Sequence, residues 1–149
     1  MTGATLSARV QLETPDLEIT LPARAENVAV VRHAVGGLGE VLEVDDQTLS
    51  DIKLAVTEAC TNVVVHAYPE AEGPMGLRAS IDERRLYLVV TDRGRGIVPR
   101  PDSPGLGLGL PLIATLAESL ELGTGDFEET QVLMTFDLGT PAVTVGNLA

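Results

Sequence analysis

The chain has 149 residues, the length of one ordinary domain, and its 44% hydrophobic and 21% charged residues are typical of a globular protein. Its net charge of −12 argues against a nucleic-acid surface, and its only lysine, Lys53, lies outside the Gly-Lys-Ser/Thr step that a Walker P-loop needs. The single cysteine excludes an intrachain disulfide, and the lack of a recognisable signal peptide or a membrane-length apolar run predicts a cytoplasmic protein that does not bind membranes.

The first half of the chain predicts one strand followed by two helices. Residues 17–21 alternate apolar and polar side chains, as a half-buried strand does. Apolar residues then recur at helical spacing from near Arg24, and glycines at 36, 37 and 39 are expected to weaken the end of that helix. The two aspartates at 45–46 predict the cap of a second helix, whose apolar stripe continues to about residue 67.

The next segments predict a β-hairpin, a loop and a third helix. Residues 76–81 and 85–91 have the pattern of two strands joined by a short turn. The stretch 93–109 is rich in glycine and proline and predicts a loop. A helix is expected over 110–120, with Pro111 tolerated in its first turn.

Two further strands are expected at 120–122 and 131–138, and they complete the predicted fold. Neighbouring strands can pair as hairpins, so the sheet should be mixed or mostly antiparallel, with the helices on one face. This is an α+β fold, a two-layer sandwich. A single domain over 1–149 is expected, with flexible ends at 1–15 and 140–149.

The first candidate site lies on the second helix. Glu58 and Asn62 are four residues apart and therefore share one face, with His66 one turn further on. A carboxylate can serve as a general base, and an amide oxygen is one of the oxygen ligands that Mg²⁺ accepts beside nucleotide phosphates. The alternative interpretation of the pair is an ordinary solvated helix face, with His66 as a structural histidine near the helix end.

The second candidate is the run from Asp92 to Gly96, which directly follows an apolar strand. An aspartate at a strand end can accept a hydrogen bond from a bound ligand, such as the exocyclic amine of adenine. Gly94 and Gly96 allow the backbone to approach that ligand closely. The alternative is a turn with a solvated aspartate.

The third candidate is the glycine run formed by Gly105, Gly107 and Gly109, which leads into a predicted helix. Free N–H groups at a helix start, together with the helix dipole, form an anion site. A Rossmann loop would need a strand directly before the glycines, and prolines precede them here instead.

The order of the three motifs resembles the N box and the two glycine boxes of the Bergerat-fold superfamily, which holds gyrase, heat-shock chaperone, histidine kinase and mismatch-repair ATPases. The segment Thr57–Tyr68 is similar in amino-acid sequence to the N box of sporulation and stress anti-sigma factor serine/threonine kinases. Asn27 and Arg32 fit the opening pattern of the same family. The resemblance covers about residues 17–138 and implies the Bergerat ATP-binding fold.

The resemblance also implies a role for each matching residue. Glu58 would be the general base toward a partner serine, and Asn62 would bind Mg²⁺ through the nucleotide. Arg32 would lie on the partner-binding surface, with a solvated helix arginine as the alternative. The remaining residues would contact ATP or ADP: adenine would be bound by Asp92, Gly94, Gly96 and Thr130, and the phosphates by Gly105, Gly107 and Gly109.

The function that the resemblance implies is an anti-sigma factor with ATP-dependent serine kinase activity. Its partners would be a sigma factor and an anti-anti-sigma protein, and a homodimer is expected. One departure concerns the stretch between Ile97 and Gly105, which is shorter than the ATP lid of sporulation-type members and gives less cover to the γ-phosphate. The alternatives are therefore a nucleotide-binding switch without kinase activity and, less favoured, a catalytic fragment of a histidine kinase.

Overall fold

Five strands form one antiparallel sheet in the computed structural model, which describes residues 14–94, 104–125 and 128–140. The strands lie in the order β1-β2-β3-β5-β4, and each pairs with its neighbour in antiparallel fashion. Their bounds are Leu17–Pro22 for β1, Pro74–Asp82 for β2, Arg85–Asp92 for β3, Ser119–Thr124 for β4 and Thr130–Asp137 for β5. The expected flexible ends at 1–15 and 140–149 lie almost wholly outside the described residues.

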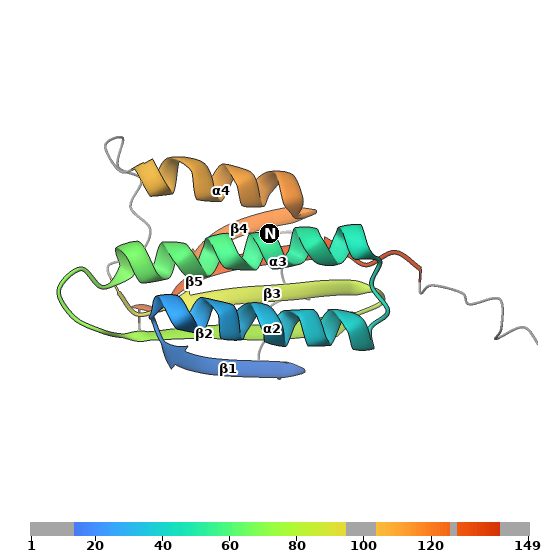
Figure 1. Ribbon diagram of the computed structural model, residues 1–149, viewed down its shortest axis with the longest axis horizontal. Helices are drawn as coiled ribbons and strands as arrows, with labels where there is room; N and C mark the ends of the chain where they lie inside the picture. The colour runs from blue at the N-terminus through green and yellow to red at the C-terminus, as the bar shows by residue number, and fades with distance from the viewer. Residues whose placement is uncertain (1–13, 95–103, 126–127, 141–149) are drawn as a thin grey trace, which may run out of the picture.

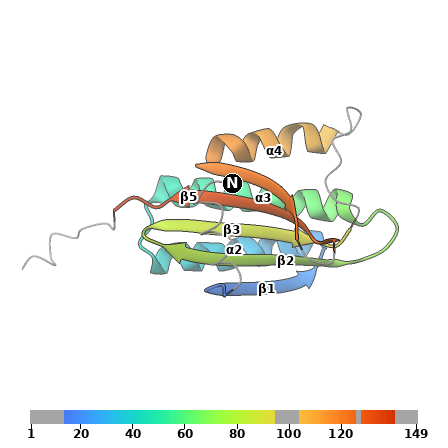
Figure 2. The same ribbon diagram turned by 180° about the vertical axis from the view of Figure 1, so that it is seen from behind.

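The helices of the described residues lie side by side on one face of this sheet (Figures 1 and 2). They are α2 (Ala25–Val41), α3 (Asp46–Asn62) and α4 (Pro104–Leu116), and α3 lies between the other two (Figure 1). The expected α+β two-layer sandwich is therefore confirmed, and the sheet is antiparallel throughout. None of the helices in this part of the chain is long and apolar enough to cross a membrane.

The core lies between the helices and the sheet face that they cover, which we call the inner face. Strand register puts directly paired residues on the same side, so Leu77, Val90 and Val132 form one apolar row across three strands. Other members of the core include Val31, Val35, Ile52, Val56, Leu86, Leu88, Ile113, Met134 and Phe136.

The start of α3 is fixed by the cap that the sequence predicts. The Asp45 carboxylate accepts hydrogen bonds from the Thr48 backbone N–H at 2.9 Å and from the Thr48 hydroxyl at 2.8 Å. These bonds satisfy one of the N–H groups that a helix leaves free at its start. They also lower the pKa of Asp45, the backbone bond most strongly.

The glycines of α2 have a different role from the one expected. The helix continues through them to Val41 rather than weakening. A Cβ at Gly39 would overlap the Leu49 side chain, and one at Gly36 would stand 2.9 Å from Cε of Lys53. Gly36 and Gly39 therefore let α2 approach α3 closely, and the packing offsets their low helix propensity, whereas a Cβ at Gly37 would meet nothing.

The third helix differs from its predicted position. It begins at Pro104 instead of Leu110 and ends at Leu116 instead of Leu120. The glycine run, which was expected to be part of a loop, therefore lies inside the first turns of the helix. Pro111 lies inside α4 and not in its first turn, and it is exposed. Its ring lacks the N–H that an interior helix position normally donates.

Truncation of the central strand gives a direct test of this core. Leu88 on β3 is 0% exposed, whereas Leu122 on β4 is 53% exposed. Leu88→Ala should lower the free energy of unfolding by about 2–5 kcal/mol, because it removes buried methyl groups and leaves a cavity. Leu122→Ala, the matched control, should change it by less than about 0.5 kcal/mol in urea titrations. Equal losses in the two variants would contradict the described packing.

Candidate functional site

Asp92 lies at the end of β3, on the inner face of the sheet. It pairs in register with Met75 on β2 and with Thr130 at the start of β5, so the three side chains share one face. Asp92 is 5% exposed. Its Oδ1 accepts the backbone N–H of Gly94 at 2.9 Å, and no partner for Oδ2 is present among the described residues. The structure thus brings Asp92 and Thr130 together, as the family resemblance implies.

Burial raises the pKa of the Asp92 carboxyl group above its ordinary value of 3.8, because removal from water disfavours the charged form. The Gly94 N–H opposes this shift by donating to the carboxylate, and the nearby negative charge of Glu129 adds to it. Buried carboxylates of this kind are typical of functional sites, since a chain gains nothing in stability by keeping them.

Glu58 and Asn62 lie in the last turns of α3, as expected. Glu58 is half-buried, and its carboxylate has no hydrogen bond or ion pair within the described ranges. Asn62 is 7% exposed, and its buried Nδ2 has no hydrogen-bond partner among the described residues. A Cβ placed on Gly109 would stand 2.9 Å from that Nδ2, so the glycine leaves room for the carboxamide against α4. A buried amide N–H without a partner is unusual in a folded protein, and a bound ligand that accepts a hydrogen bond would satisfy it.

The second helix does not continue regularly to residue 67. One turn of π-helix, η1 (Val63–Ala67), follows Asn62 and leads into Tyr68. Such turns are rare and concentrate at functional sites. A Cβ at Gly94 would overlap the backbone carbonyl of Ala67, so the chain after β3 packs directly on the end of η1.

Sequence reasoning did not single out Tyr68 beyond its place in the motif. Its hydroxyl accepts the Arg93 backbone N–H at 2.7 Å and donates to the Pro74 carbonyl at 2.5 Å. The position of a tyrosine directly before a helix-ending proline was the available signal, but it does not reveal the partners, of which Arg93 lies 25 residues further along the chain.

Other predicted residues are placed less centrally. Gly105 and Gly107 lie in the first turns of α4, and Gly96 lies outside the described residues, as does most of the short lid at 97–105. Arg32 is exposed on α2 and forms no ion pair or hydrogen bond in the described part of the chain. Asn27 has a structural role, because its Nδ2 donates to the Pro22 carbonyl at 2.8 Å and fastens α2 to β1.

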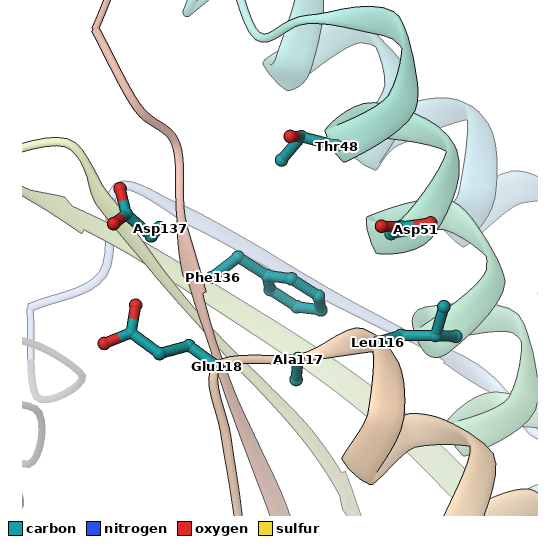
Figure 3. Close-up of a pocket in the computed structure, with 7 residues that line it drawn as sticks. All are labelled: Thr48, Asp51, Leu116, Ala117, Glu118, Phe136 and Asp137. Carbon is teal, nitrogen blue, oxygen red and sulfur yellow. The ribbon is translucent and has the colours of Figure 1, made fainter.

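A pocket of about 360 Å³ lies at the opposite end of the sheet (Figure 3). Its lining comes from the first turns of α3, the end of α4 and the end of β5, and includes Asp51, Glu118, Phe136 and Asp137. Glu118 is already paired with Arg85 at 3.1 Å. None of the predicted site residues lines this pocket, so we do not place the functional site there.

The donors around Asp92 and Asn62 fit a nucleotide with its metal ion. A buried carboxylate with a hydroxyl beside it can bind a purine edge. The amide oxygen of Asn62 is the kind of ligand that Mg²⁺ takes when phosphates supply others. No group of three or more His, Cys, Asp or Glu side chains within the described ranges could hold a metal alone. The fold and the donors at this site together define the class of an ATP-binding domain.

Comparison with known proteins agrees with this class. The family model described as the histidine kinase-like ATPase domain matches residues 21–136. The chain is 41% identical over 121 residues to the serine-protein kinase RsbW of Halalkalibacterium halodurans, covering 71% of this chain and 74% of the relative. It is 34% identical over 121 residues to the RsbW of Bacillus thuringiensis, covering 71% and 76%.

Solved structures give the same result for the fold. The RsbU and RsbW domains of Rv1364c from Mycobacterium tuberculosis match with a TM-score of 0.68 and 25% identity, over 89% of this chain and 35% of that one. The SiaB–SiaC complex from Pseudomonas aeruginosa matches with a TM-score of 0.55 and 13% identity, over 91% of this chain and 98% of that one, which is a likeness of fold alone.

The chain therefore belongs to the histidine kinase-like ATPase domain family and, within it, to the anti-sigma factor kinases of the RsbW type. Its enzyme class is protein serine/threonine kinase. The resemblance of the three sequence motifs to this family is confirmed, and ATP binding follows from the family.

Enlarging Gly94 should damage the nucleotide site. A methyl group at this position would overlap the Ala67 carbonyl and push the chain after β3 away from η1. We expect Gly94→Ala to lower ATP affinity about tenfold, measured by calorimetry, and the free energy of unfolding by about 1–3 kcal/mol. Gly123→Ala is the matched control, because a Cβ there has open space. Wild-type affinity in Gly94→Ala would contradict the contact.

Neutralising Asp92 should stabilise the protein at neutral pH. The pKa of Asp92 in the folded state is higher than the ordinary value of 3.8 for this group. The free energy of unfolding therefore decreases as the pH rises from 3.8 through the folded-state pKa. Asp92→Asn keeps an acceptor for the Gly94 N–H and removes that loss. Urea titrations should show Asp92→Asn more stable than wild type at pH 7, with the difference shrinking toward pH 3.8. A variant less stable by the same amount at both pH values would contradict this account.

Proposed function

We propose that this kinase phosphorylates a serine of an anti-anti-sigma partner and sequesters a sigma factor, with its nucleotide bound between the end of α3, the end of β3 and α4. The observation that supports the site assignment is the buried Asp92 carboxylate. Asp92 pairs in register with Thr130, and the nearby Gly94 packs against Ala67 at the end of η1. The partners themselves are inferred from the family.

Asp92 and Thr130 are the proposed contacts to adenine. The Oδ1 of Asp92 is held by the Gly94 N–H, which orients the carboxylate so that Oδ2 can accept from the exocyclic amine. Thr130 stands beside it on the neighbouring strand and offers a hydroxyl to the same base edge. Gly94 and Gly96 would line the base.

The start of α4 and the end of α3 are the proposed phosphate-binding elements. Gly105 and Gly107 lie in the first turn of α4, where free backbone N–H groups and the helix dipole favour anions, and Gly109 follows in the next turn. The amide oxygen of Asn62 would hold Mg²⁺, which neutralises charge on the phosphates and orients them for in-line transfer. The Nδ2 of the same carboxamide has no partner among the described residues and would donate to a phosphate oxygen.

Glu58 is the proposed general base toward the partner serine. It lies one turn before Asn62 on α3, and its half-buried carboxylate has no competing partner in the described part of the chain. It would accept the proton of the serine hydroxyl as that oxygen attacks the γ-phosphate. Arg32, exposed on the adjacent helix, would contact the partner, and a homodimer would be the assembled form.

A nucleotide-binding switch without kinase activity is the second candidate. The stretch between Ile97 and Gly105 favours it, because a short lid gives little cover to the γ-phosphate. Transfer of labelled phosphate from ATP to a serine of a partner distinguishes the two candidates: transfer supports the kinase, and tight ATP binding with no transfer to cognate partners supports the switch.

The role of Glu58 can be tested by a conservative change. Glu58→Gln keeps the shape of the side chain and removes the base, so phosphoryl transfer to the cognate antagonist should fall about 100-fold or more while ATP affinity stays within about twofold. Glu83→Gln, in the exposed turn between β2 and β3, is the matched control and should transfer normally. Undiminished transfer in Glu58→Gln would remove Glu58 from the mechanism.

A further inference from the structure

Tyr68 links the end of η1 to the start of β2, six residues further on, and to the residue that follows β3. It follows η1 directly, and its hydroxyl forms hydrogen bonds at the start of β2 and just after the end of β3. It accepts the Arg93 N–H at 2.7 Å, just after β3, and donates to the Pro74 carbonyl at 2.5 Å, at the start of β2. Burial raises the pKa of Tyr68, so the hydroxyl keeps the proton that it donates.

The packing around the ring leaves it little freedom. A Cβ at Gly73 would overlap the ring of Tyr68, so the glycine there makes room for the side chain. A Cβ at Gly94 would overlap the Ala67 carbonyl, the residue before Tyr68. The backbone at 93–94 is therefore held against residues 67–68 by one hydrogen bond and one close contact.

This contact reaches Asp92 through the backbone. The Tyr68 hydroxyl fixes the Arg93 N–H, and the next N–H along the chain, that of Gly94, donates to Oδ1 of Asp92 at 2.9 Å. The direction of the Asp92 carboxylate thus depends on where residues 93 and 94 are held. A buried carboxylate has few other groups to orient it, so a small displacement of this backbone would turn its free oxygen.

We propose that Tyr68 is a positioning residue, which holds the Asp92 carboxylate in the direction that discriminates adenine from purines lacking the exocyclic amine. The inference rests on the proposed contact between Asp92 and adenine. It assigns to Tyr68 no contact with the nucleotide itself. Its effect is on specificity, because a carboxylate turned away from the base loses its bond to the amine while the contacts to sugar and phosphates remain.

The test compares two nucleotides by calorimetry in the presence of Mg²⁺: ADP, and purine riboside diphosphate, which lacks the exocyclic amine. Tyr68→Phe removes the hydroxyl and keeps the ring, and it should lower the affinity ratio of the two nucleotides by roughly 3- to 10-fold, as loss of one oriented hydrogen bond does. Tyr87→Phe makes the same change in the only other tyrosine, on the opposite face of the sheet, and should keep the wild-type ratio.

A purely structural role predicts a different result, because general loosening would weaken both nucleotides equally. An unchanged ratio in Tyr68→Phe, whether or not both affinities fall, would therefore overturn the inference. Asp92→Asn separates this inference from the proposed function. The affinity ratio of the two nucleotides should fall to about one in Asp92→Asn, and the addition of Tyr68→Phe should not change that ratio further. A wild-type ratio in Asp92→Asn would show that the proposed adenine contact itself is wrong, and the inference would fall with it.

A second variant covers the case in which Tyr68→Phe does not fold. Gly73→Ala keeps the Tyr68 hydroxyl in the chain but displaces the ring that carries it. It should lower the same ratio, whereas Gly123→Ala, with open space around its Cβ, should not. A wild-type ratio in folded Gly73→Ala would overturn the role of Tyr68.

Discussion

The packing of α3 onto the inner face of the sheet is the contact on which the rest of the molecule depends. Its stripe of Ile52, Val56 and Ala59 is fully buried there, with α2 on one side and α4 on the other. Because this stripe is buried against the sheet, the flank of the helix beside it faces α4, where a Cβ on Gly109 would stand 2.9 Å from the Nδ2 of Asn62. Asn62 lies on that flank, and Glu58 lies one turn before it. The helix that builds the core therefore also presents the site residues, and its rotation cannot change without loss of both.

The site keeps polar groups where packing alone would favour apolar ones. Asp92 ends a strand whose inward-facing residues are otherwise apolar, and burial raises its pKa. Asn62 lies in the seam between α3 and α4 with one amide atom unsatisfied. Each arrangement costs stability in the free protein, and each is the kind of cost that a bound nucleotide recovers by supplying the missing partner. This pattern favours a site shaped for a ligand over polar groups that are buried without a role. It also explains why the two groups lie near the ends of their elements, where a ligand can reach them.

The π-helical turn after α3 is the feature that connects the two halves of the site. A regular α-helix would continue the α3 axis through Ala67, whereas the wider turn redirects the chain so that Tyr68 faces the ends of β2 and β3. Glycines at 73 and 94 remove the side chains that would block this approach. The contact is thus formed by Tyr68 and two glycines, and it places the end of η1 against the residues that follow Asp92.

The sequence by itself determined the two-layer α+β fold, the strands at 17–21, 76–81 and 85–91, the Asp45 cap, and the family to which Glu58, Asn62 and Asp92 point. These features depend on local periodicity, helix-capping residues and motif sequences, all of which are properties of short stretches of residues. Only the tertiary structure decided the start of α4 at Pro104, the passage of α2 through its glycines, and the contacts of Tyr68. Glycine lowers helix propensity wherever it occurs, and the tolerance of Gly36 and Gly39 depends on their close approach to α3, which only the assembled fold supplies. The register that places Thr130 opposite Asp92 is likewise a property of strand pairing, and no local pattern encodes it.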